Sequence, residues 1–366
     1  MRFRHGLVIG KFYPPHAGHE YLIRTAATFA DQVTVVVMAA DHETLPLAQR
    51  LGFIRESFAA WPHVTVSGVI DNLPVDYDDD EVWGAQVALM REGISLADSA
   101  AGRTAVAVDA VFSSEDYGVE LARRFAAVPV CLDRDRILYP VSGSAVRSEP
   151  ASHWDFLAPA VRAYFTRRVV ILGAESTGTT TLARALQTAY RQRGGVWART
   201  GLVPEYGREY SINLLAAARG VALARQAPEP RREDLAWHSA QFHHVARVQT
   251  DWEEAAARDG APLLLCDTDA LATCLWHERY VGGADPGLEA FARALPPRAL
   301  YLLTGIAGVP FVDDGLRDGA HVREGMHQRF IERLSAQATP WAMVSGDADT
   351  RISRVIDLID DLLPSG

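Results

Sequence analysis

The strongest constraint on the fold is the stretch of residues 6–19, GLVIGKFYPPHAGH, near the start of the chain. Its apolar run Leu7–Ile9 predicts a buried strand, and Pro14 and Pro15 exclude a helix directly after that strand. Helical spacing of apolar residues begins at His19. The stretch therefore predicts a strand, a tight loop and the start of a helix.

The glycines and histidines of this loop suit an anionic ligand. Gly10 and Gly18 allow the backbone to approach a ligand closely. His16 and His19 are three residues apart, so their imidazoles can converge on one anion at a helix N-terminus. We therefore expect a nucleotide triphosphate to bind here. The alternative is that both histidines are ordinary surface residues of a loop.

Strands and helices continue to alternate through the first half of the chain. Residues Gln32–Ala39 are nearly all apolar and rich in β-branched side chains, as expected of a central parallel strand. Residues Pro46–Ala60 have helical periodicity, while Val64–Val69 and Val106–Ser113 predict further strands. This α/β order predicts a doubly wound, Rossmann-like parallel sheet that binds its ligands at the carboxyl ends of its strands.

Two features of this half have competing interpretations. The acidic run Asp76–Glu81 could be a metal cluster, but its spacing matches no calcium loop. Consecutive carboxylates ahead of a helical segment favour a solvated helix start instead. Trp83 follows this run, and it could stack on a planar base or a nicotinamide ring, or belong to the core.

Two later segments carry groups that suit phosphates. Residues Ser113–Gly118, SSEDYG, lie where the carboxyl end of a predicted strand should meet the site. Residues Ser142–Arg147, SGSAVR, place hydroxyls at a helix start ahead of an arginine. Each segment alone is also an ordinary helix cap. Together with GKFYPPHAGH, they resemble the nucleotidyltransferase superfamily that includes the nicotinamide-nucleotide adenylyltransferases.

The resemblance implies a nucleotidyl transfer that the protein promotes by positioning and by electrostatic stabilisation. The phosphate of a mononucleotide would attack the α-phosphate of ATP in line, and pyrophosphate would leave, with Mg²⁺ bridging the phosphate oxygens. The residues expected to stabilise the growing charge are Lys11, His16, His19 and Arg147. The other nucleotide-binding residues expected in this half are Gly10, Phe12, Gly18, Trp83, Glu115, Ser142 and Ser144.

A second strand and glycine loop begin after Thr166, so we predict two domains, residues 1–166 and 167–366. Residues Val169–Leu172 predict the strand, and the sequence GAESTGTTT at 173–181 leads into a helix. This is the architecture of a P-loop, whose backbone amides cradle phosphates. The nucleotide-binding residues expected in this loop are Gly173, Ser176, Thr177, Gly178, Thr179, Thr180 and Thr181.

The metal and charge positions of this P-loop are only partly standard. Thr180 occupies the Mg²⁺-ligand position, whereas Thr179 stands where P-loops carry a lysine. Residues Leu263–Cys266 predict an apolar strand that ends in Asp267, the pattern of a Walker B strand that places an acid near the metal. Since the lysine is missing, a nearby arginine could supply the cation instead.

These segments, with the sequence VPEYGREY that begins at residue 203, resemble the ribosylnicotinamide kinase domain of the bifunctional NadR-like enzymes. The other half of those enzymes is a nicotinamide-mononucleotide adenylyltransferase. The resemblance implies that Asp267 assists Mg²⁺ and that Glu205 or Asp269 holds or deprotonates the ribose 5′-hydroxyl. Arg317 and Arg323 would belong to a lid over the phosphates; the alternative is that they are surface charges.

The combined resemblance predicts an enzyme of NAD salvage. Its second half would phosphorylate ribosylnicotinamide with ATP, and its first half would adenylylate the product to NAD. One alternative keeps the adenylyltransferase but treats the lysine-free P-loop half as a nucleotide-binding regulator. Another is a transferase that acts on a different small phosphate ester.

Composition limits where such a protein works and what it binds. The formal net charge of -10 disfavours nonspecific nucleic-acid binding, and no apolar run approaches the roughly 20 residues of a membrane span. The three cysteines form no C-x-x-C pair, which suits a reducing compartment. We expect a cytoplasmic enzyme without a DNA-binding domain, membrane partner or nucleic-acid partner, and leave homo-oligomers open. Its expected small-molecule partners are ATP, nicotinamide mononucleotide, ribosylnicotinamide and NAD.

Overall fold

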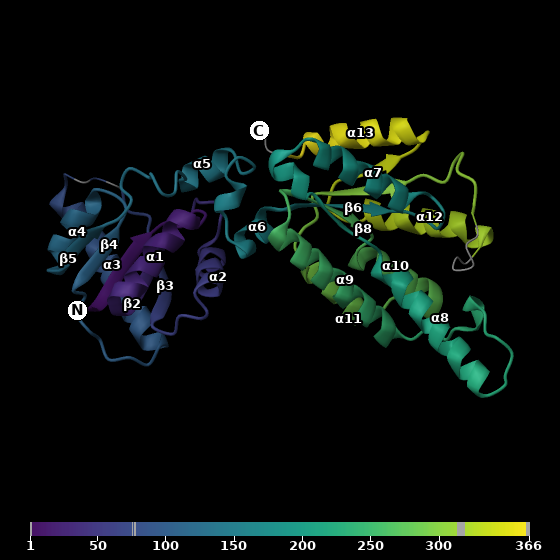
Figure 1. The fold of residues 1–366 in the computed structure, drawn as a ribbon, viewed down its shortest axis with the longest axis horizontal. Helices are drawn as coiled ribbons and strands as arrows, with labels where there is room; N and C mark the ends of the chain where they lie inside the picture. The colour runs from purple at the N-terminus through teal and green to yellow at the C-terminus, as the bar shows by residue number, and fades with distance from the viewer. Residues whose placement is uncertain (1, 75, 77, 313–318, 364–366) are drawn as a thin grey trace. The chain divides into compact units, whose positions relative to one another are not determined.

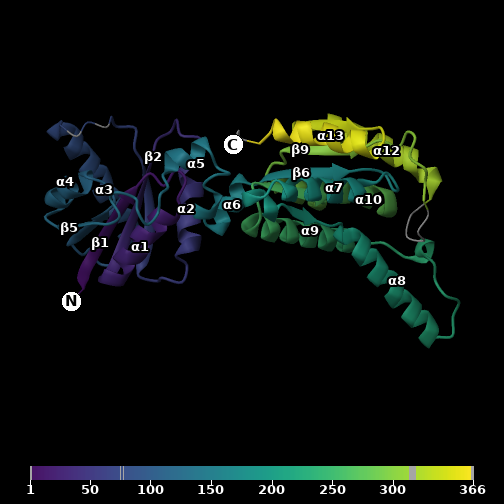
Figure 2. The ribbon, with the colours of Figure 1, turned by 45° about the horizontal axis from the view of Figure 1, so that its top comes forward.

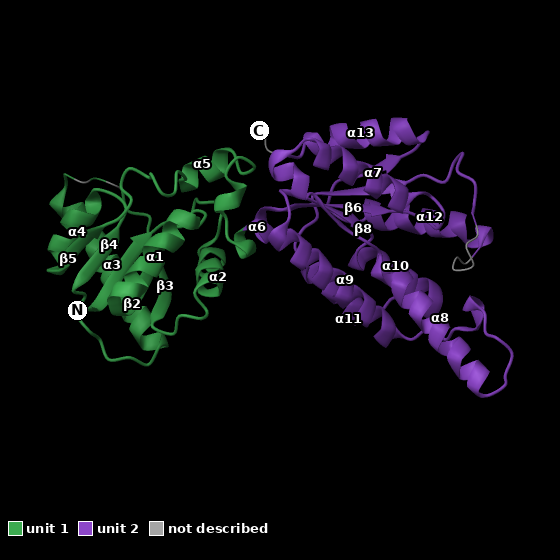
Figure 3. Ribbon diagram, in the orientation of Figure 1, with its two compact units in different colours: residues 1–161, 366 green, residues 162–365 purple. Residues whose placement is uncertain are grey.

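A computed structural model describes residues 2–74, 76, 78–312 and 319–363 (Figure 1). The chain divides into two compact units, residues 1–161 and 162–365 (Figure 3). Within the described residues, each unit is built on a five-stranded sheet whose neighbouring strands all run parallel. The predicted α/β class with two parallel sheets is confirmed. No helix in the described part of the chain is long and apolar enough to cross a bilayer.

The first sheet places the glycine- and histidine-rich loop at its centre. Its strands are β1 (Phe3–Gly10), β2 (Ala30–Ala39), β3 (Val64–Ile70), β4 (Ala110–Ser113) and β5 (Val128–Cys131). Their order is β3-β2-β1-β4-β5, so the chain leaves β1 toward one edge of the sheet and later returns to its other side at β4. The carboxyl end of β1 therefore lies at the point where the strand order reverses, which is where open α/β sheets bind ligands.

Helices cover both faces of the first sheet because successive strand residues point to opposite faces. Val8 packs with the buried side of α1 (Ala17–Phe29) and α2 (Leu47–Ser57). Its neighbours Leu7 and Ile9 pack with α3 (Asp80–Ala100) and α4 (Tyr117–Phe125). The remaining helical segments are α5 (Gly143–Ser148), the 3-10 turn η1 (Trp154–Phe156) and α6 (Pro159–Phe165).

The acidic run before α3 and the strand predicted at Val106–Ser113 are both present in this unit, the strand in a shorter form. The Asp79 carboxylate caps α3, accepting hydrogen bonds from the amides of Glu81 at 2.7 Å and Val82 at 3.3 Å. The acidic run is therefore a helix start, as predicted. The strand predicted at Val106–Ser113 is shorter than expected, because β4 begins only at Ala110.

The second sheet likewise has its glycine loop after the central strand. Its strands are β6 (Arg167–Leu172), β7 (Gly201–Val203), β8 (Leu263–Asp267), β9 (Leu300–Thr304) and β10 (Trp341–Val344), in the order β10-β9-β6-β8-β7. The register pairs Ile171 of β6 with Asp267 of β8. The P-loop and the predicted Walker B acid consequently leave the sheet at the same edge.

Helices also cover both faces of the second sheet (Figure 2). One face packs against α7 (Thr179–Gln192) and α13 (Ala348–Asp360). The other packs against α9 (Ser239–Asp259), α10 (Ala270–Val281) and α12 (Ala320–Ser335). The remaining helical segments are η2 (Gly195–Arg199), α8 (Tyr206–Ala224), η3 (Arg232–Asp234) and α11 (Pro286–Ala294).

Candidate functional site

The first unit contains a cavity of about 630 Å³ at the carboxyl end of β1. The structure brings most of the predicted site residues of this half to its wall, namely Gly10, Lys11, Phe12, His19, Trp83, Glu115, Ser144 and Arg147. His16 lies beside this wall, because its ring centroid is 3.8 Å from that of His19. Gly18 contacts the His16 ring in turn, since a Cβ atom added at Gly18 would lie 3.3 Å from it.

Burial favours the uncharged forms of His16 and His19. Burial lowers the pKa of His16 to about 4, and it lowers the pKa of His19 well below its ordinary value. Among the described residues, the buried Nδ1 atom of His16 has no hydrogen-bond partner. His19 therefore meets the cavity as a neutral hydrogen-bonding group rather than as a cation, and the neighbouring His16 has one ring nitrogen left for a further polar partner.

The depressed pKa of His16 gives a direct prediction. Without nucleotide, the ring protons of His16 should show no titration in NMR spectra between pH 8 and pH 5.5, because the neutral form persists until about pH 4. An ordinary histidine titrates near pH 6.5. Bound ATP should raise the pKa, since nearby phosphate charge favours the imidazolium. The variant His16→Asn identifies the signal, and a midpoint near 6.5 without nucleotide would contradict the buried geometry.

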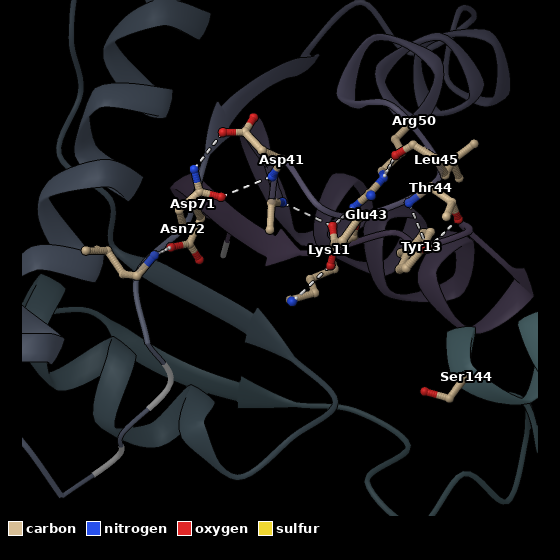
Figure 4. Close-up of polar contacts among 12 residues, drawn as sticks. Lys11, Tyr13, Asp41, Glu43, Thr44, Leu45, Arg50, Asp71, Asn72 and Ser144 are labelled. Atoms are coloured by element: carbon tan, nitrogen blue, oxygen red, sulfur yellow. Dashed lines mark hydrogen bonds and ion pairs between the residues drawn. The ribbon is translucent and has the colours of Figure 1, made fainter.

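Lys11 is held by a buried carboxylate (Figure 4). The Glu43 side chain, only 5% exposed, accepts hydrogen bonds from Lys11 Nζ at 3.0 Å and from the Ala40 amide at 3.1 Å, and it pairs with Arg50 at 2.7 Å. Burial raises the pKa of Glu43, but these three partners outweigh burial and hold the pKa below its ordinary value. Glu43 is therefore an anion that positions the Lys11 ammonium at the cavity wall.

Arg50 and Tyr13 extend this network to the second phosphate segment. The fully buried Arg50 donates to the Lys11 carbonyl at 3.0 Å, and its guanidinium carbon lies 4.4 Å from the Tyr13 ring centroid. The Arg147 guanidinium lies 4.1 Å from the same ring and donates to the Tyr13 carbonyl. Tyr13 also hydrogen-bonds the Thr44 hydroxyl at 2.6 Å. Contacts to Tyr13 thus connect the first phosphate loop to the segment that carries Arg147.

The segment around α5 combines a helix cap with a close approach to the first loop. The Ser142 hydroxyl accepts from the Ala145 amide at 3.1 Å, so its cap role is observed. A Cβ atom at Gly143 would lie 2.6 Å from the Tyr13 carbonyl oxygen, which explains why glycine stands there. Arg147 donates to the Ser144 hydroxyl at 3.4 Å. Ser144 and Arg147 therefore face the cavity together.

Trp83 and Glu115 have contacts beyond the cavity. Trp83 is 5% exposed and belongs to the core beneath α3, with the Arg124 guanidinium carbon 5.0 Å from its ring centroid. It also forms part of the cavity wall, so the two interpretations of Trp83 are compatible. Glu115 forms an exposed ion pair with Arg136 at 3.1 Å.

The second unit contains a cavity of about 220 Å³ bounded by residues 171–181, which include the whole P-loop. Gly178 has a φ of 83°, a left-handed conformation that favours glycine. A Cβ atom at Gly173 would lie 2.1 Å from the Thr304 hydroxyl, so only glycine fits there as well. The Thr304 hydroxyl lies 2.6 Å from the Thr177 hydroxyl, and Thr177 donates to the Ala174 carbonyl at 2.7 Å. The loop conformation is thus held by close packing and by its own hydroxyls.

The two residues predicted to hold Mg²⁺, Thr180 and Asp267, meet at this loop, and Glu205 lies in the same cavity wall. The Thr180 hydroxyl donates to Asp267 at 2.5 Å, as the predicted P-loop and Walker B strand require. Glu205 lies at the start of α8. Burial, followed by the negative charge of Asp267, raises the pKa of Glu205 to about 7. A carboxylate with that pKa suits proton abstraction near neutral pH.

Asp269 is not placed for the alternative base role. Among the described residues, the cavity wall includes Asp267 but not Asp269. The Asp269 carboxylate is 2% exposed, caps α10, accepts from the Tyr301 hydroxyl at 2.8 Å and pairs with Arg298 at 3.2 Å. Core contacts therefore occupy Asp269, and the structure corrects its assignment as a candidate base. The sequence does not reveal this, because Asp269 lies only two residues beyond Asp267 and its core partner Arg298 is distant in the chain.

Of the two arginines predicted to form a lid, the structure describes only one. Arg317 lies outside the described residues. Arg323, on α12, donates to the carbonyls of Val309 at 2.7 Å and Ser176 at 3.1 Å, so it grips the P-loop backbone. Arg232 also lines the cavity and pairs with Glu175 at 3.6 Å, although nothing in its polar, proline-containing surroundings predicts this position.

Aromatic side chains also line the second cavity. They include Trp237, Phe242, Trp276 and Tyr280. The Trp237 ring centroid is 5.3 Å from that of Phe242 and 5.4 Å from that of Tyr280. The cavity therefore joins a phosphate-binding loop to a surface suited to a planar ring. Sequence reasoning missed this group because its members come from separate segments with no shared spacing.

Known protein families match both halves of the chain. A family model described as AAA domain matches residues 168–351, slightly more than half of the chain. The chain belongs to the AAA domain family. A second model, described as citrate lyase ligase C-terminal domain, matches residues 6–73, which contain the first phosphate loop.

This AAA domain protein is also similar to NadR over nearly its whole length. It is 23% identical to the trifunctional NAD biosynthesis/regulator protein NadR of Escherichia coli (strain K12) and 24% identical to that of Salmonella typhimurium. Each alignment covers 98% of this chain and 83% of the relative. A phosphopantetheine adenylyltransferase of Kocuria rhizophila is 35% identical over 92 residues, which cover 25% of this chain and 59% of that protein. The predicted NadR-like character is confirmed.

Two solved structures have the same fold as this chain. A crystal structure of NadR protein in complex with NR has a TM-score of 0.69 and 21% sequence identity, and the match covers 100% of this chain and 98% of that one. A structure of NadR protein in complex with NAD and AMP-PNP has a TM-score of 0.67 and 21% identity, covering 100% and 97%. Both support the arrangement of two parallel sheets in one chain.

Proposed function

We propose that this protein is a bifunctional enzyme of NAD salvage, which phosphorylates ribosylnicotinamide and adenylylates nicotinamide mononucleotide. The observation that carries the proposal is that each unit has its own cavity where a phosphate-suited loop leaves the central strand of a parallel sheet. Similarity to the NAD biosynthesis protein NadR over 98% of the chain supports the choice of substrates. Residues 1–166 and 167–366 are the proposed functional domains.

In the first unit, the phosphate of nicotinamide mononucleotide attacks the α-phosphate of ATP. A new phosphorus–oxygen bond forms as the bond to the β-phosphate breaks, and pyrophosphate leaves. Lys11 and Arg147 offset the charge on the phosphates, while His16 and His19 donate hydrogen bonds as neutral imidazoles. Trp83 provides a planar surface at the cavity wall for an aromatic ring.

In the second unit, the 5′-hydroxyl oxygen of ribosylnicotinamide attacks the γ-phosphate of ATP. Glu205 accepts the hydroxyl proton, the bond to the β-phosphate oxygen breaks, and ADP leaves. The P-loop amides hold the phosphates, and the aromatic side chains of the cavity wall receive the nicotinamide ring, whose positive charge favours aromatic faces.

Mg²⁺ is the proposed cofactor of the second reaction. The Thr180 hydroxyl and the Asp267 carboxylate, 2.5 Å apart, are oxygen donors of the kind that Mg²⁺ prefers. When bound, Mg²⁺ would offset charge on the transferred phosphate.

ATP use and the three free cysteines support the expected cytoplasmic location. The absence of a nucleic-acid partner stays a prediction.

Thr179 supports one alternative function. The missing lysine removes the usual cation from the P-loop, so the second unit could bind nucleotide as a regulator without transferring phosphate. The position of Glu205 beside the Thr180–Asp267 pair favours the kinase instead, since a regulatory site has no need of a base.

Two conversions test the proposal, each supplied with ATP: ribosylnicotinamide to its mononucleotide, and nicotinamide mononucleotide to NAD. We expect His19→Ala to slow only the second by about 100-fold or more, and Thr180→Ala to slow only the first by a similar factor. Thr188→Ala, an exposed threonine on the same helix as Thr180, is the matched control.

The outcomes separate the candidates. Conversion of nicotinamide mononucleotide alone would make the second unit a regulator. Conversion of neither substrate would refute the assignment to nicotinamide nucleotides.

A further inference from the structure

Arg351, in the first turn of α13, is a buried cation beneath the P-loop. Its side chain is 7% exposed, and its guanidinium donates to three backbone carbonyls. These belong to Thr177 at 2.9 Å, Gly346 at 2.9 Å and Gly305 at 3.3 Å. The helix that carries it packs on the same face of the sheet as α7, which begins at the P-loop. A residue distant in sequence therefore supports the phosphate-binding loop from behind.

The charge of Arg351 is unusual among the buried arginines. Across residues 2–74, 76, 78–312 and 319–363, no carboxylate forms an ion pair with it. A buried cation without an anion is costly, and carbonyl dipoles offset only part of that cost. The other buried arginines each pair with a carboxylate: Arg50 with Glu43 at 2.7 Å, Arg168 with Glu254 at 2.9 Å, and Arg298 with Glu253 at 2.8 Å. An anion in the P-loop would supply the compensation that Arg351 lacks.

Arg351 also orients a peptide group of the loop. In a trans peptide, the carbonyl and the following N–H point in opposite directions. Because the Thr177 carbonyl accepts from Arg351 behind the loop, the Gly178 N–H points away from Arg351. Gly178 lines the cavity, and a Cβ atom there would lie 4.0 Å from the nearest guanidinium nitrogen of Arg351. The cation therefore lies one peptide layer behind the surface that would hold the phosphates.

We propose that Arg351 is the positioning residue that lets this P-loop bind nucleotide phosphates without its usual lysine. It orients the peptide between Thr177 and Gly178, and it supplies a permanent positive charge behind the loop that partly replaces the lysine missing at Thr179. The inference deepens the proposed kinase function and rests on nucleotide binding by the second unit.

Substitutions at two positions test this role through the KM for ATP in ribosylnicotinamide phosphorylation. Arg351→Met should raise that KM by about 10- to 100-fold, the range expected when a charged hydrogen-bonding group is lost. The KM for ribosylnicotinamide should change by less than about twofold, because Arg351 is not among the residues that line the cavity proposed to hold this substrate. Arg351→Lys, which keeps the charge, should recover part of the loss. Arg354→Met, an exposed arginine on the same helix, is the matched control.

A second substitution distinguishes loss of the Arg351 charge from a general disturbance of the fold. Thr179→Lys returns the missing lysine to the loop, and it should lower the KM for ATP at least tenfold more in the Arg351→Met background than in the wild-type background. A purely structural role for Arg351 predicts no such rescue, because a lysine at 179 does not rebuild the contacts to the three carbonyls. Equal effects in both backgrounds, or an unchanged KM in Arg351→Met, would overturn the proposal.

The experiments also distinguish a failure of the kinase assignment from a failure of the proposed role of Arg351. If the wild-type chain does not phosphorylate ribosylnicotinamide, the kinase function is refuted, and the same variants are compared by calorimetry with a non-hydrolysable ATP analogue. Every protein in this comparison then also carries His19→Ala, which weakens nucleotide binding at the first site. A tenfold or greater loss of affinity in Arg351→Met supports the positioning role, and equal affinity refutes it.

Discussion

Replacing Glu205 with glutamine should slow ribosylnicotinamide phosphorylation by about 10²- to 10⁴-fold, the usual contribution of a positioned base. Glutamine keeps the size of the side chain but cannot accept the hydroxyl proton. The effect should appear in kcat, with little change in the KM for ATP, because Glu205 is proposed to contact the ribose rather than the phosphates. NAD formation from nicotinamide mononucleotide should be unchanged, since that reaction belongs to the first unit.

The pH dependence of kcat/KM provides an independent check of Glu205. Its pKa of about 7 means that the acid is largely protonated at pH 6 and largely ionised at pH 8. Phosphorylation should therefore increase as the pH rises through 7 and level off above it. Burial is the first cause of the raised pKa and persists when a metal ion offsets the charge of Asp267.

Glu205→Gln should abolish this rise, whereas Glu209→Gln, an exposed acid on the same helix, should retain it. A wild-type profile that is flat from pH 6 to pH 8 would exclude Glu205 as the base.

Replacing Glu43 with glutamine should lower the free energy of unfolding by about 3–5 kcal/mol, because it leaves the buried Arg50 without its anion. The same change releases the Lys11 ammonium, so NAD formation should also slow, with a higher KM for ATP. Urea unfolding and steady-state kinetics at pH 7 measure the two effects. Glu92→Gln, an exposed acid on α3, should change neither quantity appreciably.

A double variant distinguishes the structural role of Glu43 from its role toward Lys11. Glu43→Gln combined with Arg50→Met removes both buried charges, so it should recover much of the lost stability. It should not recover the KM for ATP, since Lys11 still lacks its carboxylate partner. Full recovery of both stability and KM would show that Glu43 acts only through Arg50.

The parts of the fold that could be predicted rest on local signals. The first phosphate loop has an apolar strand before it and a helix after it, and the P-loop has the same surroundings. Parallel strands buried on both faces are recognisable as short apolar runs, so β1, β2, β6 and β8 were predictable. The strand predicted at 106–113 was too long because its first residues are apolar without joining the sheet.

The supporting residues of both sites were not predictable from local patterns. Glu43 and Arg50 lie in an ordinary loop and helix, yet their partner Lys11 is more than thirty positions away in the chain. Arg351 and Thr177 are 174 positions apart. Asp267 and Asp269 are two positions apart in the chain, but only Asp267 meets the Thr180 hydroxyl, whereas Asp269 turns into the core toward Arg298.

The amino-acid sequence alone therefore determined the α/β class, the two phosphate loops and the likeness to NadR, because strand periodicity, glycines and loop hydroxyls act over a few neighbouring residues. The tertiary structure decided which charges serve the sites and which serve the core. It showed that burial keeps His16 neutral, raises the pKa of Glu205 and places Arg351 behind a loop without a lysine. Burial and pairing depend on segments brought together by folding, and these long-range contacts leave no periodic trace in the chain.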